Sequence, residues 1–334
     1  MIEFFRMLDR MMVRMRVTKR AFMGLTAATL VGAPALAADK VISGTLGGQA
    51  PLWPFYVAAH KGFFAAENLD VEINFAKSGP AITEQLTAGS LDAILSVGVS
   101  DPIHAIDKGA SLALIRIIGD VPPYVLIAKA GIKSIADLKG KTISVGNRND
   151  PTTYYFERMA AANGLKSGDY QVLSAGVAAA RYAALKAGIA DAAMVLPPLN
   201  FRASRAGYAT LGVSADYIKN LPFTGMAVYK PWAAAHPPVV RRLLAATDSS
   251  IGWLNDTGHR REAVDLLVRV AHADAEDAGL SYDFLHRIRY FEPSRKVSRA
   301  KLQDLIDVER DAGRISSAVT IDHVIMPGLT ELTN

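Results

Sequence analysis

The sequence contains no cysteine, and this absence removes several classes of protein at once. Without a thiol the chain cannot form disulfides, use a thiolate nucleophile or bind zinc through sulfur. It also lacks a Gly-x-Ser-x-Gly elbow, a Walker phosphate loop and a His-Glu-x-x-His helix, and its seven histidines are scattered without metal-like spacing. We therefore expect no enzyme activity, no cofactor and no metal, and we look for the function in a binding site.

A long hydrophobic run is also missing, although the first 37 residues resemble an export signal. Six basic residues stand against two acidic ones in residues 1–20, and a short apolar stretch follows over residues 21–31. Pro34-Ala35-Leu36-Ala37 then offers the small residues that a signal peptidase requires. The apolar stretch is shorter than the roughly 20 residues of a membrane span. We predict a signal peptide over residues 1–37 and a periplasmic protein, with an uncleaved membrane anchor as the alternative.

An excess of positive charge disappears with that segment. The chain has 37 basic and 32 acidic residues, and residues 1–37 hold six and two of them, which leaves 31 and 30. A nucleic acid or an anionic membrane surface is therefore not an expected partner. About 300 remaining residues exceed the usual size of a single core, so that we expect two lobes.

Short apolar segments alternate with helix-length segments, as in α/β sheets built from right-handed crossovers. We expect helices after residue 231, almost without interruption to residue 312. The predicted strands cover residues 41–46, 71–75, 93–96, 112–118, 124–128, 142–145, 171–173, 192–196 and 227–229. The predicted helices between them cover residues 81–88, 102–108, 151–163 and 178–187. Gly89 and, in a looser copy of the same pattern, Gly188 are expected to end two of these helices in the left-handed conformation.

Three strand-to-helix junctions share one pattern, a capping or permissive residue directly before a proline. They are Ser78-Gly79-Pro80, Ser100-Asp101-Pro102 and Asn149-Asp150-Pro151. Proline suits the first helical position, and the free N–H groups of a helix start attract oxyanions. Ligands of open α/β sheets bind beyond the carboxyl ends of the strands, where such junctions lie. The pattern favours an oxyanion-receiving cleft, with well-capped helices as the alternative for each junction.

Longer stretches of the chain resemble the substrate-binding proteins of nitrate/sulfonate/taurine-type ABC importers, whose domain is shared with thiamine-pyrimidine synthesis proteins. The stretches that carry the resemblance are Val57-Ala58-Ala59-His60-Lys61-Gly62-Phe63-Phe64, Asn68-Leu69-Asp70-Val71-Glu72, Leu86-Thr87-Ala88-Gly89-Ser90-Leu91-Asp92-Ala93, residues 132–146 and Ala187-Gly188-Ile189-Ala190-Asp191-Ala192-Ala193. The resemblance implies a type II periplasmic-binding-protein fold, which consists of two α/β lobes, a two-strand hinge and a C-terminal helical jacket.

The same resemblance implies the domain boundaries and the partners. Lobe I is expected over residues 38–121 and 225–334, and lobe II over residues 122–224, with prolines near both crossings. The expected partners are a small solute, which is anionic or sulfonate-like, and the permease and ATPase of an importer in the inner membrane. We expect a monomer.

Ligand contacts of the family lie in the loops after successive strands, and the corresponding positions of this chain are our candidate site. Glycines let a ligand approach the backbone, Gln49 offers both a donor and an acceptor, and Trp53 would form a wall of the pocket. A core or surface aromatic is the alternative for Trp53. Arg148 is the candidate for gripping an anion with two parallel hydrogen bonds, and a solvated loop arginine is its alternative. The complete candidate set is Gly48, Gln49, Trp53, Ser78, Gly79, Ser96, Asn147, Arg148, Thr152, Thr153, Gly176 and Pro197.

Other interpretations remain open at this point. Trp53, Tyr124, Tyr154 and Tyr155 are compatible with a larger or aromatic solute, although one tyrosine of the adjacent pair should lie in the core. An enzyme or pyrimidine-precursor binder resembling the thiamine-pyrimidine branch is a second interpretation, but the enzyme branch uses a cysteine-rich motif that this chain lacks. A third is a solute sensor for a membrane signalling partner.

Overall fold

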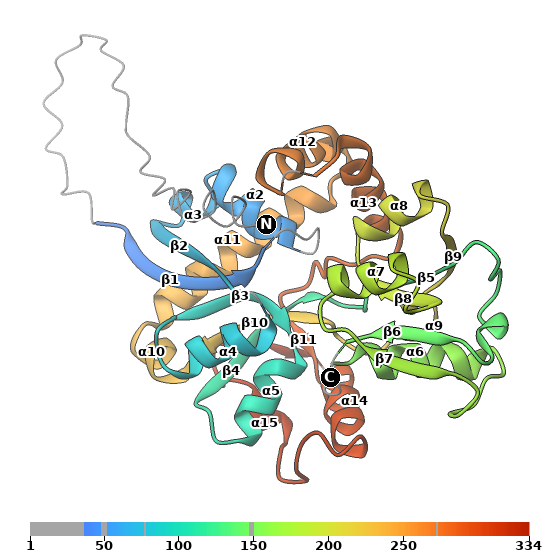
Figure 1. Cartoon of the computed structure of the whole chain (residues 1–334). Coiled ribbons are helices and arrows are strands. Elements are labelled where there is room, and N and C mark those ends of the chain that lie inside the picture. The colour runs from blue at the N-terminus through green and yellow to red at the C-terminus, as the bar shows by residue number, and fades with distance from the viewer. Residues whose placement is uncertain (1–36, 48–51, 77, 147–149, 272, 334) are drawn as a thin grey trace, which may run out of the picture. The chain divides into compact units, whose positions relative to one another are not determined.

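Two separate β-sheets organise the computed structural model (Figure 1). The structure describes residues 37–47, 52–76, 78–146, 150–271 and 273–333. The predicted export signal, apart from its last residue, and the candidates Gly48, Gln49, Asn147 and Arg148 lie outside these residues. We call the first sheet and the elements packed on it lobe I, and the second sheet with its helices lobe II.

Lobe I contains a five-stranded sheet in the order β2-β1-β3-β10-β4. Strand β1 pairs in parallel with β2 and β3, whereas β10 runs antiparallel between β3 and β4. All eight residues of β4 are buried, as expected for a strand that is covered on both faces. The bounds of these strands are β1 Asp39–Leu46, β2 Leu69–Ala76, β3 Ala93–Gly98, β4 Leu112–Gly119 and β10 Thr224–Tyr229.

Lobe II repeats this plan with the order β7-β6-β8-β5-β9. Strand β6 pairs in parallel with β7 and β8, and β5 runs antiparallel between β8 and β9. Strand β9 was missed in the sequence, because a five-residue segment with a central Thr-Leu-Gly has little strand signal of its own. The bounds are β5 Val125–Ala128, β6 Thr142–Val145, β7 Gln171–Ser174, β8 Ala192–Val195 and β9 Ala209–Val213.

Helices join the strands as right-handed crossover units require. Left-handed glycines end α4 and α7 at Gly89 and Gly188, with φ angles of 70° and 76°, as the sequence predicted. In lobe I these helices are α2 Trp53–His60, α3 Phe63–Ala66, α4 Gly79–Thr87 and α5 Ser100–Asp107. In lobe II they are the 3₁₀ turn η2 Ala136–Leu138, α6 Thr152–Ala162, α7 Ala178–Lys186, α8 Leu199–Arg205 and α9 Ser214–Tyr217.

The chain passes between the sheets twice, from β4 to β5 and from β9 towards β10. The buried hydroxyl of Ser214 ties the two passages together, because it accepts the N–H of Tyr124 at 3.0 Å and donates to the carbonyl of Pro122. On the lobe I side, the N–H of Phe223 donates to the carbonyl of Gly119 at 2.8 Å. These contacts hold the two crossing segments side by side.

The C-terminal third is helical, as predicted, and covers lobe I. Its elements are α10 Lys230–Ala235, α11 Pro237–Asn255, the 3₁₀ turn η3 Thr257–His259, α12 Arg260–Ala271, α13 Ala275–Arg287, α14 Arg299–Asp311 and α15 Ile321–Val324, with the short parallel pair β11 Val297–Ser298 and β12 Leu332–Thr333. Helix α13 also reaches lobe II, since Asp277 pairs with Arg205 on α8. The rings of Phe201 and Phe284 lie 6.2 Å apart at the same contact.

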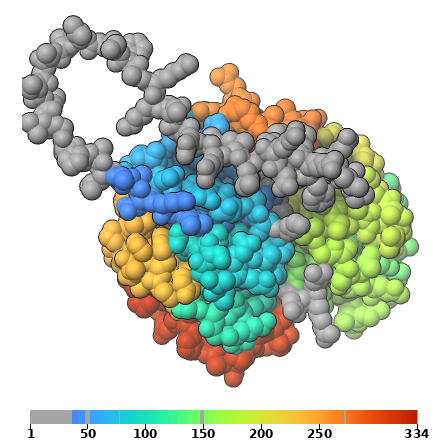
Figure 2. Space-filling model, turned by 60° about the vertical axis from the view of Figure 1, so that its left-hand side comes forward, coloured from blue at the N-terminus to red at the C-terminus, as the bar shows by residue number. Residues whose placement is uncertain are grey.

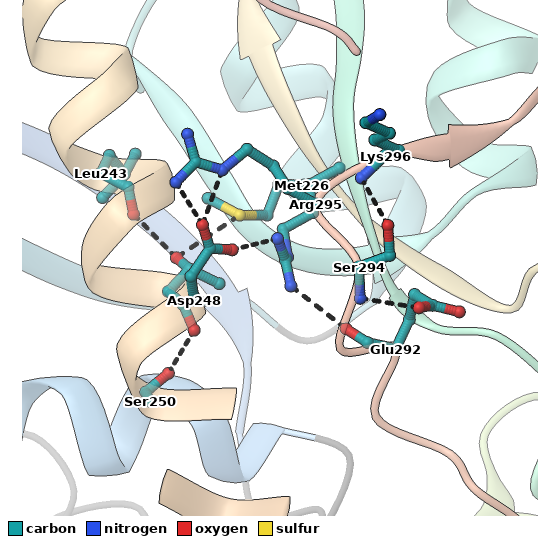
Figure 3. A network of polar contacts seen from close by, with 10 residues as sticks. Met226, Leu243, Asp248, Ser250, Glu292, Ser294, Arg295 and Lys296 are labelled. Carbon is teal, nitrogen blue, oxygen red and sulfur yellow. Dashed lines mark hydrogen bonds and ion pairs between the residues drawn. The ribbon is translucent and has the colours of Figure 1, made fainter. Parts of the chain in front are cut away.

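A buried ionic network fastens β4 to α11 (Figure 3). Arg116, which has no exposed surface, pairs with Asp248 and donates to the carbonyl of Glu292 at 3.1 Å. The other carboxylate oxygen of Asp248 accepts from Nε of Arg295 at 2.6 Å. A fully buried guanidinium needs such partners, because an unpaired buried charge is very costly. The network therefore fixes the long helix behind the lobe I sheet.

Candidate functional site

The candidate site lies beyond the carboxyl ends of the parallel strands in both lobes. In lobe I this edge holds the end of β3 and the starts of α4 and α5, and in lobe II it holds Gly146 after β6 and the starts of α6 and α7. In the space-filling view the cyan residues of lobe I adjoin the yellow-green residues of lobe II (Figure 2). Charged groups of lobe I and lobe II act on one another, which indicates that these two edges face each other.

Asp101 is the central group of the lobe I edge. It lies in the first turn of α5, and its carboxyl is close to Gly79 at the start of α4 and to Gly98 at the end of β3. A Cβ atom at Gly79 would collide with Oδ2 of Asp101, and one at Gly98 would lie 3.4 Å from it. Only glycine at position 79 leaves room for this carboxyl. No hydrogen-bond donor to the Asp101 side chain is found among the described residues.

Burial raises the pKa of Asp101 to about 7, which is far above the ordinary value of an aspartate. Nearby His104 lowers this pKa, whereas the carboxylates of Asp150 and Glu309 raise it further. Asp150 belongs to lobe II, so that two carboxyl groups repel each other across the two edges. A desolvated carboxyl without a partner is a feature of functional sites more often than of structural ones.

Glu309 on α14 holds α5 in place below Asp101. Its buried carboxylate accepts from Ser100 at 2.8 Å, from His104 at 2.7 Å and from Arg314 at 2.6 Å. Burial alone would raise the pKa of Glu309, but these hydrogen bonds outweigh it and bring the pKa to about 2. The helical jacket therefore fixes the orientation of the helix that carries Asp101.

On the lobe II edge, Asp150 is held by the start of α6. One of its oxygens accepts both the N–H of Thr152 at 2.8 Å and the Thr152 hydroxyl, whose oxygen in turn accepts the N–H of Gly146 at 2.8 Å. Asp150 thus accepts from the first residue of α6, although the N-cap position itself belongs to Pro151. The fully buried side chain of Thr152 is thereby occupied within lobe II.

Tyr124, at the first crossing between the lobes, connects these charges with a buried arginine. Burial raises the pKa of its hydroxyl to about 12, the carboxylates of Asp150 and Asp101 raise it as well, and Arg181 opposes them. The guanidinium of Arg181 lies 5.3 Å from the centre of the Tyr124 ring. Charges from both lobes, those of Asp101, Asp150 and Arg181, therefore act on one tyrosine.

Arg181 itself is 2% exposed, and its Nε and Nη1 atoms have no hydrogen-bond partner in the described structure. It lies on α7, which follows Gly176 after β7. Buried guanidinium donors are almost always satisfied by an acceptor. Arg181 was absent from the sequence-derived set, because Ala178-Ala179-Ala180-Arg181 reads as an ordinary solvent-facing helix turn. Only the three-dimensional contact with Tyr124 identifies it.

The remaining candidate residues that the structure describes differ in whether their side chains already have a partner within the protein. Ser78 caps α4, the alternative that we gave for its junction, with its hydroxyl accepting the N–H of Ala81 at 3.3 Å. Ser96 is 1% exposed at the end of β3, and its hydroxyl has no hydrogen-bond partner in the described structure. Thr153 is partly exposed, Gly176 is left-handed with φ 69°, and Pro197 begins a cis Pro197-Pro198 pair after β8. As ligand contacts these residues stay predictions.

Trp53 has a different environment from the one we expected. Its side chain has no exposed surface, its indole N–H donates to the carbonyl of Ala263 at 2.9 Å, and its ring packs edge-on against Tyr282 at 5.7 Å. The ring and the indole N–H of Trp53 both contact the C-terminal helices that pack against α2. We therefore do not retain Trp53 among the residues proposed to face a ligand.

The three proline junctions form helix starts, but the expected position of the proline is wrong in each. Helix α4 begins one residue before Pro80, and α5 begins at Ser100, two residues before its proline. Helix α6 begins after Pro151, which occupies the N-cap. Asp101 consequently lies inside the first turn instead of capping it, and this position leaves its carboxyl without a donor.

Three further observations complete the description of the site. In the described part of the chain, no group of three or more His, Asp and Glu side chains is arranged to hold a metal ion. Within the same residues, no helix has both the length and the apolar character for crossing a membrane. A small hollow that is lined by Asp120, Pro222 and Lys301 lies at the crossings, away from Asp101 and Arg181.

Comparison with known proteins places this arrangement in context. Riboflavin-binding protein RibY of Chloroflexus aurantiacus is 26% identical over 238 residues, which cover 70% of this chain and 66% of RibY, slightly less than two thirds of its length. The periplasmic aliphatic sulphonate-binding protein SsuA of Escherichia coli is 20% identical, with a TM-score of 0.72 over 87% of this chain and 98% of SsuA. The periplasmic nitrate-binding protein NrtA of Synechocystis PCC 6803 is 16% identical, with a TM-score of 0.70 and 87% of each chain covered.

The structural likenesses confirm the predicted fold class, two α/β lobes of the periplasmic-binding-protein type with a helical C-terminal part. The family model described as NMT1/THI5 like matches residues 49–257, which is well over half of the sequence. This range contains Asp101, Tyr124, Asp150 and Arg181. The chain therefore belongs to the NMT1/THI5-like family.

Proposed function

We propose that this protein is an exported solute receptor, which binds a small organic compound between its two lobes and delivers it to an ABC importer. The observation that carries the proposal is the set of unsatisfied groups around Tyr124. Arg181 from lobe II is buried and Asp101 from lobe I is half-buried, and both lack sufficient hydrogen-bond partners among the described residues. A solute between the edges would supply the missing partners.

The family relationship and the likeness to SsuA and NrtA, whose names describe binding of sulphonates and nitrate, support the same interpretation. The segment before residue 38, with its basic start and Ala-x-Ala ending, supports a periplasmic location. A permease and an ATPase are the partners that this role requires. The expected grip of Arg148 on an anion stays a prediction.

Thermal denaturation of the purified protein with a set of solutes tests the proposal. A solute that binds only the folded protein at 100 times its Kd adds about 2.7 kcal/mol to the free energy of unfolding, which raises Tm by several degrees. Suitable probes are taurine, ethanesulfonate, nitrate, 4-aminopyrimidine and riboflavin. A raised Tm with saturable binding in calorimetry supports the receptor function. Unchanged Tm and no heat of binding with every probe at millimolar concentration would count against it.

A further inference from the structure

The chemistry of the unsatisfied groups limits what kind of solute fits, given the receptor function proposed above. Asp101 offers its carboxyl oxygens, and Asp150 offers the oxygen that does not accept from Thr152. These oxygens require hydrogen-bond donors when the carboxyls are ionised. Arg181 offers N–H groups, which require acceptors, and it has no capacity to accept. The guanidinium of Arg181 lies 5.3 Å from the centre of the Tyr124 ring, and the charges of Asp101 and Asp150 both raise the pKa of the same tyrosine. A solute between the lobes must therefore supply both hydrogen-bond donors, for the carboxyls, and hydrogen-bond acceptors, for Arg181.

A simple oxyanion supplies acceptors for Arg181 but no donors for the carboxyls. Nitrate or an alkylsulfonate would satisfy Arg181, but its negative charge would add to the repulsion between Asp101 and Asp150. Nitrogen donors are a better complement for these carboxyls, because a cationic or amino group relieves the repulsion. Carboxylates in contact with such donors form the stronger, charge-assisted class of hydrogen bond.

We infer that the cleft is specific for a small dipolar solute, one that presents a nitrogen donor to Asp101 and Asp150 and an acceptor group to Arg181. Aminosulfonates, amino acids and amino-substituted nitrogen heterocycles have this chemistry. Arg181 and Asp101 are then the two specificity-determining residues, one from each lobe. Thr152 and Glu309 do not select the solute, because their polar groups already form hydrogen bonds within the protein.

Matched pairs of probes separate this inference from the receptor function itself. Taurine and ethanesulfonate differ by one amino group, as do 4-aminopyrimidine and pyrimidine, and β-alanine and propionate. We expect the member with the nitrogen donor to raise Tm more in any pair that binds. Asp101→Asn should remove that preference and weaken binding of the donor member roughly 10- to 100-fold, the range for a hydrogen bond to a charged group.

The lobe II half of the inference has its own variant. Arg181→Lys keeps the positive charge but loses the planar donor fork, so that we expect weaker binding of both members of a pair. Matched controls are Asp70→Asn on β2 and Arg158→Lys on α6, which change exposed side chains of the same types in the same lobes. Both controls should bind every probe as the unchanged protein does.

A measurement without any probe tests the assignment of Asp101 independently. If its carboxyl awaits a ligand, Asp101→Asn should raise the Tm of the protein alone at pH 8, because it removes a desolvated and repelled charge. A structural role for that carboxyl predicts a lower Tm. The inference is overturned if Asp101→Asn lowers Tm, or if ethanesulfonate or nitrate binds as tightly as taurine and Asp101→Asn changes neither affinity. The second result would leave the receptor function standing.

Discussion

Replacement of Asp101 by asparagine provides a sharp test of the electrostatics at the site. In the folded protein the pKa of this carboxyl is about 7, compared with 3.8 for an unperturbed aspartate. Each unit of such a shift corresponds to about 1.36 kcal/mol. The full shift would correspond to about 4 kcal/mol, and because the side chain is only half-buried we expect about 2 kcal/mol after solvent screening.

The sign of the effect follows from proton linkage. The folded state holds the proton of Asp101 between about pH 4 and 7, whereas the unfolded chain has released it. The stability of the wild-type protein therefore falls as the pH rises through this range, and the cost is complete above pH 7. Asparagine cannot ionise, so that it avoids the cost.

We expect Asp101→Asn to be about 2 kcal/mol more stable than wild type at pH 8, with a clearly smaller gain at pH 5. Urea denaturation at pH 5, 6.5 and 8 measures both numbers, and Asp70→Asn serves as the exposed control. His104, Asp150 and Glu309 face the same carboxyl, and they are present in both proteins. Loss of stability at pH 8, or an equal gain at pH 5 and pH 8, would show that ionisation of Asp101 does not carry this cost in the folded protein.

Three further substitutions test the supports of the site. Glu309→Gln should cost about 3 kcal/mol at pH 7, because the hydrogen-bonded carboxylate has a pKa of about 2; the difference from wild type should shrink in urea titrations as the pH falls from 5 towards 3. Asp248→Asn should cost roughly 3–5 kcal/mol in denaturant unfolding, since it leaves Arg116 buried without its countercharge, and a loss below 1 kcal/mol would contradict that role. Arg205→Gln should lower Tm by several degrees, because it leaves the buried Asp277 unpaired at the contact between α8 and α13; an unchanged Tm would show that this contact carries little energy.

Local sequence rules predicted much of the fold. Strands β1 to β8 and β10 were expected within a few residues, because apolar segments between turn residues mark strands that are covered on both faces. The glycines after α4 and α7 were correctly assigned as left-handed helix ends. The expectation that one of two adjacent tyrosines lies in the core is also confirmed, since Tyr155 is 2% exposed and Tyr154 only half-buried.

The candidate site was harder to predict, because its features arise from contacts between distant segments. Asp101 looked like a helix cap from its neighbours in sequence, but its unusual pKa depends on burial and on Asp150 and Glu309. The sequence around Arg181 does not mark it as buried, because its side chain packs against Tyr124 in a distant segment. Trp53 was expected in a pocket, yet its partners Ala263 and Tyr282 are more than 200 positions away. Side-chain identity alone does not distinguish these environments.

The most direct test of the central claim is calorimetric titration of the purified protein with taurine, 4-aminopyrimidine and their donor-free counterparts, repeated for Asp101→Asn and Arg181→Lys. We expect saturable binding of at least one solute that carries a nitrogen donor, weaker binding of its counterpart and a loss of affinity in both variants. Binding that is unaffected by both substitutions would show that the solute does not lie between Asp101 and Arg181, and would contradict the account.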